Sequence, residues 1–179
     1  SGDTHFANNV QVADNFIDMN VAAPGGAWWS TDTCVDGTQS GVKVMECRRG
    51  KLSWYYKPFG RGPDYQLEYI PFGQSVCHSN AFVVNIWDWD PQWKVEWIQD
   101  GTNMGPMVQC TDYSPQYIKE INEAMEGKEI PGYKMPSRNI HFFSCTPDRN
   151  ASKIEIVVSN RFKQSWKQKF LMSDYVEVQ

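Results

Sequence analysis

The chain has 179 residues, a formal net charge of −4 and 14% aromatic residues. The acidic balance argues against an extended nucleic-acid-binding surface, because proteins that bind phosphate backbones usually carry a basic stripe. The length fits one domain or two small, closely packed ones, and no apolar run reaches the roughly 18 residues that a membrane-spanning helix needs.

The N-terminal quarter of the chain mixes short strands with glycine-rich turns. Residues 1–24 are expected to form an N-terminal extension or the first strands, and a Pro-Gly-Gly turn follows. Trp28 and Trp29 should then begin a strand or a packed loop. In an extended chain they would point to opposite sides, one into the core and one toward a rim, a ligand or a neighbouring domain. Asp36-Gly37 marks the next turn.

A β-hairpin and a further strand follow. Apolar alternation over residues 42–47, a charged turn with glycine at 48–51 and an aromatic run over 52–56 predict the hairpin. Residues 65–70 predict another strand. The glycine-rich loop at 59–63 between them does not have the spacing of a phosphate-binding loop.

Residues 81–101 carry the strongest β signal of the chain. Residues 82–89 are rich in β-branched and aromatic side chains, which predicts a strand. Asp90-Pro91 breaks the run, because proline has no N–H for a sheet and fixes φ. A second alternating strand covers 93–98, and Asp100-Gly101 closes it with a hairpin turn.

The remaining elements are one edge strand, one helix and two closing strands. Residues 104–110 resemble an edge strand weakened by Gly-Pro. Ser114 as N-cap, proline after it and an apolar stripe predict a helix over 114–127, which would plug one end of a sandwich or bridge its sheets. Residues 139–145 and 154–158 should be the closing strands. The pattern predicts an all-β fold, an immunoglobulin-like or related β-sandwich with one short α-helix, in a single domain over residues 1–179.

Five segments, in order, resemble a known domain. Asp-x-Asp-Pro-x-Trp at 88–93, followed by a Lys-Val-Glu strand and an Asp-Gly turn, is similar to the C-terminal domain of bacterial calcineurin-like metallophosphoesterases of the Bacteroides type. The other matching segments are Gly-Ala-Trp-Trp at 26–29 with Asp36-Gly37, residues 54–57 with 63–66, residues 140–143 and residues 153–158. The resemblance covers roughly residues 20 to 170. It departs at residues 160–163, where Asn-Arg-Phe-Lys stands in place of the usual Asp-Arg-Phe-Gly turn.

The resemblance implies a role for the chain. It would be the non-catalytic accessory domain of a secreted, periplasmic or cell-surface phosphoesterase, packed against the catalytic domain of the same protein and shaping or shielding its active site. An exposed apolar or aromatic patch should then mark the docking surface. The candidate contact residues are Trp28, Trp29, Trp54, Phe59, Arg61 and Tyr65.

The chain carries no assembled catalytic motif. The metal-binding DxH, GDxxD, GNHE and GHxH segments of the calcineurin-like catalytic domain do not occur here, and His5, His78 and His141 are scattered. We therefore expect no catalytic residue, cofactor or metal in this fragment, and divalent metals only in the catalytic domain of the parent. A stand-alone hydrolase is the weaker possibility.

Two alternative sites and the cysteines remain open. Asp88, Asp90 and Asp100 could hold calcium, although Asp90 can equally cap the turn before Trp93 and Asp100 can fill a hairpin position. A carbohydrate-binding module is the main alternative function, in which tryptophans form a sugar-stacking platform: Trp28, Trp29, Trp54, Trp87 and Trp93. Most tryptophans of a sandwich belong to the core. The five cysteines are expected to be buried or half-buried, with one disulfide possible in an oxidising compartment.

Overall fold

The computed structural model describes residues 4–175. Twelve strands and one α-helix make up this part of the chain, with two short 3₁₀ helices. The bounds are β1 Asn8–Ala13, β2 Phe16–Asn20, β3 Gly41–Arg48, β4 Lys51–Pro58, β5 Leu67–Ile70, β6 Phe82–Ile86, β7 Lys94–Gln99, β8 Thr102–Pro106, β9 Val108–Asp112, α1 Pro115–Met125, η1 Gly132–Lys134, β10 Asn139–Cys145, β11 Lys153–Ser159, β12 Ser165–Leu171 and η2 Met172–Asp174.

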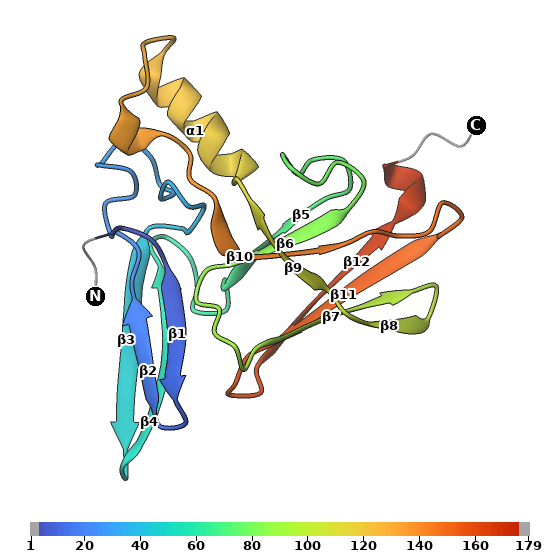
Figure 1. The fold of residues 1–179 in the computed structure, drawn as a ribbon, viewed down its shortest axis with the longest axis horizontal. Helices are drawn as coiled ribbons and strands as arrows, with labels where there is room; N and C mark the ends of the chain where they lie inside the picture. Colours follow the sequence, from blue (N-terminus) through green and yellow to red (C-terminus); the bar gives the residue numbers. More distant parts are fainter. Residues whose placement is uncertain (1–3, 176–179) are drawn as a thin grey trace.

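Two four-stranded antiparallel sheets form a β-sandwich, as the sequence predicts. One sheet has the strand order β5-β6-β10-β9 and the other β12-β11-β7-β8 (Figure 1). The core between them takes alternate side chains from each strand: Phe82, Val84 and Ile86 from β6, Val95 and Trp97 from β7, and Ile154, Ile156 and Val158 from β11. Each such fully buried side chain contributes roughly 1.5–3 kcal/mol. The inner faces therefore follow the period-two geometry of extended strands.

Strand β6 is shorter than predicted. It ends at Ile86 rather than residue 89, because residues 87 and 88 turn out of the sheet, and the alternation expected for Trp87 and Trp89 stops there. All five residues of β6 are buried, since its outer face is covered as well. The turn at Asp90-Pro91 is confirmed by the bond from the Trp93 N–H to the Asp90 carbonyl, 3.0 Å.

The strands that follow β6 are divided between the two sheets. Strand β7 pairs with β11 and β8, not with β6, so the chain crosses from one sheet to the other at residues 87–93. The hairpin turn at Asp100-Gly101 is confirmed, with φ of 49° and 88°. The single edge strand predicted over 104–110 is wrong: β8 and β9 are separate strands at the edges of different sheets, and the chain changes sheet at Met107.

Strand β12 was not predicted. It pairs with β11 along its whole length and forms one edge of its sheet. The turn before it, at residues 160–164, places Lys163 at φ 66°. This left-handed conformation is the one that glycine favours, and glycine is what the related pattern has at this position.

Helix α1 begins and ends where the sequence predicts, but it does not bridge the sheets. The Ser114 hydroxyl accepts a hydrogen bond from the Tyr117 N–H at 3.2 Å. The buried side chains Tyr117 and Ile121 pack against loop residues Ala27 and Val35. The helix therefore packs on the loop of residues 27–35.

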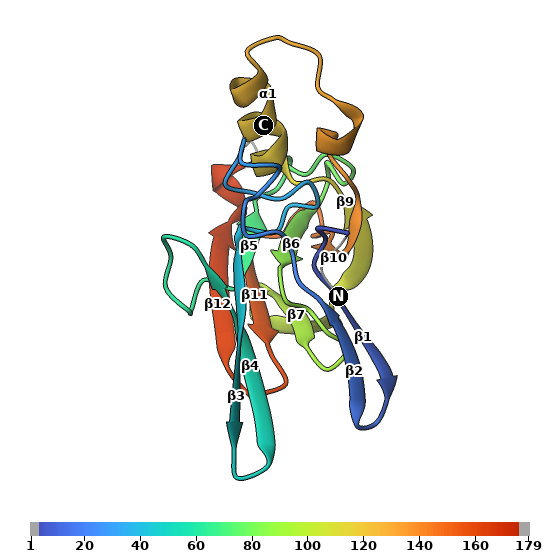
Figure 2. The ribbon, with the colours of Figure 1, turned by 90° about the vertical axis from the view of Figure 1, so that its left-hand side faces the viewer.

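Two hairpins stand apart from the sandwich. Strands β1 and β2 form one two-stranded sheet, and β3 and β4 form another. Both extend beyond the two large sheets in the same direction (Figures 1 and 2). The turn of the second hairpin lies at Arg49-Gly50, as predicted, with φ of 52° and 74°.

Candidate functional site

The histidines do not form a catalytic group. His141 lies on β10, where its Nδ1 is 2.6 Å from the Asn85 Oδ1 and its Nε2 is 3.3 Å from the Asp36 Oδ2. It is a buried strand residue with a partner at each ring nitrogen. His5 packs beside Trp28. Among residues 4–175, no three His, Cys, Asp or Glu side chains are grouped as a metal ion would require.

Asp36 is the most completely bonded carboxylate of the described chain. It accepts hydrogen bonds from the Ala7 N–H at 2.9 Å, the Thr38 N–H at 3.1 Å and the Asn139 amide at 3.0 Å, besides its contact with His141. Burial alone raises the pKa of Asp36, but His141 and the N–H groups of Ala7 and Thr38 outweigh it and hold the pKa below its ordinary value. With every oxygen occupied, Asp36 anchors its loop on the outer face of the sheet.

The carboxylates considered for calcium have separate structural partners. The Asp88 Oδ1 is 2.7 Å from the Lys43 Nζ, and both side chains are buried. Asp90 receives two hydrogen bonds of 2.8 Å from Arg161. It also caps its own turn, because its Oδ1 accepts from the Gln92 N–H at 2.8 Å. Asp100 accepts from the Lys153 N–H at 2.8 Å.

Trp28 and Trp29 are both on the surface. They lie in a turn with φ of 56° and 61°, not in the extended conformation assumed for opposite-facing side chains. Trp28 is 51% exposed and packs edge-on against Tyr133, while Trp29 is 87% exposed. The expectation that one of them enters the core is therefore wrong, because the left-handed turn directs both outward.

The other predicted contact residues divide into buried and exposed ones. Trp54 is only 7% exposed and packs against Phe162, so it is not available on the surface as predicted. Tyr65 is half-buried against Trp87, with the exposed Arg61 guanidinium 5.2 Å above its ring. Phe59 is 50% exposed at the end of β4. The structure brings together Arg61 and Tyr65 in this contact, and it places Trp29 and Phe59 in the wall of one groove.

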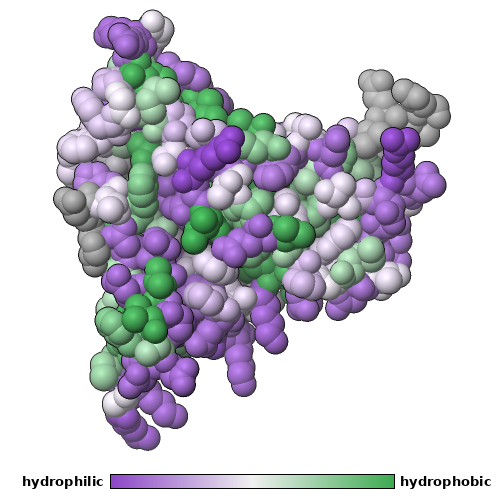
Figure 3. Space-filling model, viewed as in Figure 1, coloured by the Kyte–Doolittle hydropathy of each residue, from purple (hydrophilic) through white to green (hydrophobic). Residues whose placement is uncertain are grey.

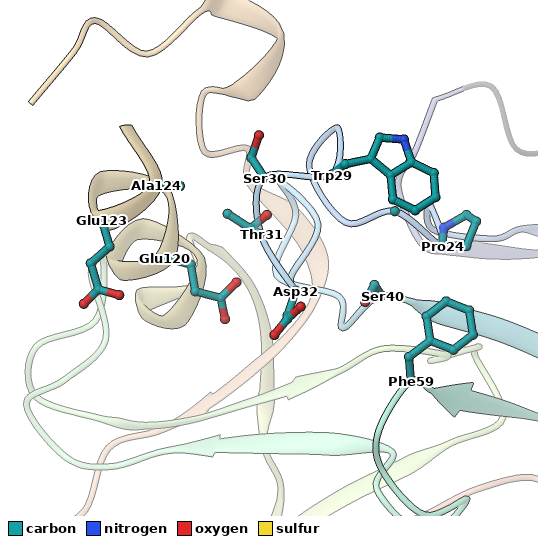
Figure 4. A pocket seen from close by; sticks show the side chains of 11 residues that line it. Pro24, Trp29, Ser30, Thr31, Asp32, Ser40, Phe59, Glu120, Glu123 and Ala124 are labelled. Atoms are coloured by element: carbon teal, nitrogen blue, oxygen red, sulfur yellow. The ribbon is translucent and has the colours of Figure 1, made fainter. Parts of the chain in front are cut away.

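A surface groove of about 580 Å³ lies where Trp29 and Phe59 meet (Figure 4). Its walls come from the loop after β2, the beginning of β3, the end of β4 and the C-terminal half of α1. Figure 4 shows Trp29, Pro24 and Phe59 at one end and the carboxylates of Asp32, Glu120 and Glu123 at the other. The two aromatic residues were predicted contact residues, but the three acidic ones were not, because only the packing of α1 on its loop places them here.

The projecting hairpins carry a second apolar surface that the sequence analysis missed. Six large apolar side chains on them are between 39% and 57% exposed: Val10, Val12 and Phe16 on β1 and β2, and Val42, Met45 and Leu52 on β3 and β4. Figure 3 shows apolar side chains gathered over this part of the molecule. Alternation predicted that one face of each strand is apolar, but it could not show that this face meets no sheet in the described structure.

The sugar-stacking platform of five tryptophans is not formed. Trp54 and Trp87 are buried. Trp93 stacks on Trp166 with ring centroids 5.5 Å apart and packs against the core. Only Trp28 and Trp29 of the five remain open to a ligand.

The cysteines occupy mixed environments. Cys34 and Cys145 are buried and Cys110 is half-buried, as expected, but Cys47 and Cys77 are exposed, which corrects the prediction for these two. All five are free thiols. No helix within residues 4–175 is long and apolar enough to cross a membrane.

Comparison with known families gives one match. Residues 18–166 match the family model described as the C terminal of calcineurin-like phosphoesterase. Neither the curated proteins nor the solved structures contain a match to the chain.

Proposed function

The chain belongs to the family formed by the C-terminal part of calcineurin-like phosphoesterases, and from this premise we propose that it is the non-catalytic accessory domain of a Bacteroides-type enzyme. Residues 1–179 act as one domain, with residues 1–24 as its N-terminal extension or first strands. The parent is secreted, periplasmic or on the cell surface, and its divalent metals belong to its catalytic domain. The accessory domain packs against the catalytic domain and shapes or shields its active site.

The exposed apolar residues of the two hairpins carry this proposal. An isolated two-stranded hairpin is marginally stable in water, and an apolar surface of this kind on a folded domain commonly marks an interaction site. The hairpins are nevertheless fixed at their base, because Lys43 on β3 bonds both Asp88 and the Asn9 amide of β1 at 2.7 Å. A rigid, apolar projection suits docking against a neighbouring domain.

The partners of the buried polar groups support a role without catalysis. Asp36, Asp88 and Asp90 are each engaged by protein donors, and His141 has a partner at each ring nitrogen. A general acid or base needs a free position within hydrogen-bond reach of a substrate. These groups hold the fold together instead.

Two exposed cysteines provide a direct test of docking. Cys47 lies on β3 opposite the exposed Leu52, and Cys77 lies in the loop before β6. Iodoacetamide modification of both thiols is followed by peptide mass spectrometry in the 179-residue chain and in the full-length phosphoesterase. We expect modification of Cys47 to be at least about tenfold slower in the full-length enzyme, because docking buries the hairpin.

Cys77 is the internal control. Desolvation and the Asp112 carboxylate raise the pKa of its thiol, which slows its reaction equally in both proteins. Its rate should not differ between them. Equal rates for Cys47 in the two proteins, or protection of Cys77 alone, would contradict docking through the hairpins.

Carbohydrate binding remains the alternative function. One observation favours it: Trp29 and Phe59 flank a groove that also contains the hydroxyl-bearing residues Ser30, Thr31 and Ser40. An exposed indole beside polar side chains is a chemistry that suits a sugar ring. Binding of a soluble glycan that is lost in Trp29→Ala would favour this alternative over domain docking.

A further inference from the structure

The aromatic end of the groove is held in place by the backbone. The Trp29 N–H bonds the Gly25 carbonyl at 2.8 Å, and the indole rests against Gly25 so closely that a Cβ there would lie 2.9 Å from the ring. Opposite it, the Phe59 N–H bonds the Ser40 carbonyl at 2.9 Å. The Trp29 ring is thus supported on one side while 87% of the residue stays exposed. A large apolar ring positioned in this way offers a face to a ligand.

The acidic end carries carboxylates without cationic partners. Within residues 4–175, neither Asp32, Glu120 nor Glu123 forms a salt bridge. Glu120 is fixed by the Thr33 N–H and hydroxyl, each at 3.0 Å, but these neutral donors leave its charge uncompensated. Beneath it on β5, burial and then the charge of Glu120 raise the pKa of Glu68 to about 7. The three carboxylates outnumber the Lys134 ammonium, which donates to the hydroxyl of the groove residue Ser30 at 2.6 Å, so the groove has an excess of negative charge.

We propose that this groove binds a basic segment of a polypeptide partner, in which an arginine or lysine meets the carboxylates of Asp32, Glu120 and Glu123 and a neighbouring apolar side chain packs on Trp29 and Phe59. A guanidinium or ammonium group supplies the positive charge that pairs with these carboxylates, and its alkyl stem can cover apolar surface on the way to the aromatic end. A neutral glycan would cover the rings and leave the carboxylates uncompensated. The site lies at the base of the hairpins, not on their apolar residues, and it stands independently of hairpin docking.

The test compares two peptides that differ only in charge. Acetyl-Leu-Arg-Leu-amide and its citrulline analogue, a neutral isostere of the arginine peptide, are titrated into the ¹⁵N-labelled 179-residue chain. The reporter is the indole N–H signal of Trp29, assigned by its loss in Trp29→Phe. We expect the arginine peptide to shift this signal and the citrulline peptide to bind at least about fivefold more weakly, which corresponds to one close charge pair in water.

Variants that each remove one negative charge test whether the arginine peptide binds at the groove. Asp32 and Glu123 are exposed, so Asp32→Asn and Glu123→Gln remove charge from the groove without disturbing the core. Each should weaken the arginine peptide about threefold to fivefold. Asp14→Asn makes the same change of net charge in the exposed turn between β1 and β2 and should have no effect.

Three outcomes would overturn the proposal. Equal affinity for the arginine and citrulline peptides would show that charge is not recognised. A loss of affinity in Asp14→Asn as large as in the groove variants would show that the net charge of the protein, and not the groove, determines the affinity for the arginine peptide. A Trp29 shift caused by cellohexaose or chitohexaose but by neither peptide would assign the groove to a glycan.

Discussion

At the scale of single residues, Gly37 sets how closely the loop over β6 approaches the sheet. Its φ is +87°, and a Cβ at this position would lie 2.6 Å from the Ser114 Cβ and 2.8 Å from the Asn85 Nδ2. The Gly37 carbonyl accepts a hydrogen bond from the same Asn85 amide at 2.9 Å. A side chain here would push apart the loop, the helix N-terminus and the strand.

Gly37→Ala should destabilise the protein far more than Gly101→Ala. Gly101 has nearly the same φ, +88°, but a Cβ there would meet nothing within 4 Å. Gly101→Ala therefore carries only the cost of a left-handed alanine, about 1–2 kcal/mol, while Gly37→Ala adds an overpacking cost of about 1–3 kcal/mol. Urea denaturation of both variants measures the difference. Equal losses would show that the loop moves away without cost.

Glu68 gives the protein a testable pH dependence. In the folded state burial, and then Glu120, raise its pKa from 4.5 to about 7. Between these two values the folded protein retains a proton that the unfolded chain has released. The contribution of Glu68 to folding therefore becomes less favourable as the pH rises from about 4.5 to 7.

Glu68→Gln should remove this contribution. Relative to the wild type, the variant should gain stability by on the order of 2–3 kcal/mol between pH 4.5 and pH 8, because one pKa unit corresponds to about 1.36 kcal/mol. Denaturation at several pH values measures this difference. The comparison with wild type isolates Glu68 from Asp36 and Asp88, whose pKa values are shifted down and up respectively. Parallel stability curves for the two proteins would contradict the assignment.

At the scale of elements, helix α1 and two tight turns were predicted correctly, because neighbouring residues determine their positions. Helix α1 has its N-cap serine and a proline in its first turn, both readable from the chain. The turns at Arg49-Gly50 and Asp100-Gly101 are likewise set by glycine at positive φ. These elements form in the structure where the sequence placed them.

Strand β12 and the boundary between β8 and β9 have only a weak signal in the local sequence. In strand β12 only Phe170 is buried and Trp166 half-buried, while Lys167 and Lys169 face solvent. Charged residues of this kind protect an edge strand from pairing with another chain. They also interrupt the apolar alternation by which a strand is recognised in a sequence. Strands β8 and β9 were merged for a related reason, because sequence shows a run of extended residues and not the change of sheet at Met107.

At the scale of the whole molecule, Arg161 joins four parts of the chain. It bonds Asp90 with both Nε and Nη2 at 2.8 Å and the Gln11 side chain of β1 at 3.1 Å. Its guanidinium also lies 4.7 Å above the Trp54 ring of β4. The β11–β12 turn, the turn before β7 and both hairpins thus meet at one side chain.

Arg161→Ala should destabilise the protein by about 3–5 kcal/mol, because it leaves the fully buried Asp90 carboxylate without its cation. Lys169→Ala is the matched control. It removes the exposed Lys169–Glu155 ion pair of β12 and β11 and should cost less than about 1 kcal/mol. Thermal and urea denaturation compare the two. A small loss in Arg161→Ala would contradict a stabilising role for the Arg161–Asp90 pair.

Local patterns in the chain were sufficient to predict the fold class and most of the strands, turns and the helix. Alternation and β-branched residues predicted strands at β6, β7 and β11, glycine and proline predicted the turns, and Ser114-Pro115 predicted the helix, because each of these signals depends on neighbours within a few residues. The resemblance of the chain to a phosphoesterase C-terminal domain was likewise visible in its motifs, and the family match confirms it.

Only the tertiary structure decided which of these surfaces remain open. Trp54 and Leu52 are on the same strand and point the same way, yet Trp54 is buried beneath Arg161 and Phe162 while Leu52 is 50% exposed near the hairpin tip. Trp29 and Glu123 are distant in sequence and share one groove. Exposure depends on what packs from elsewhere in the chain, and long-range packing leaves no periodic signal in a local stretch of sequence.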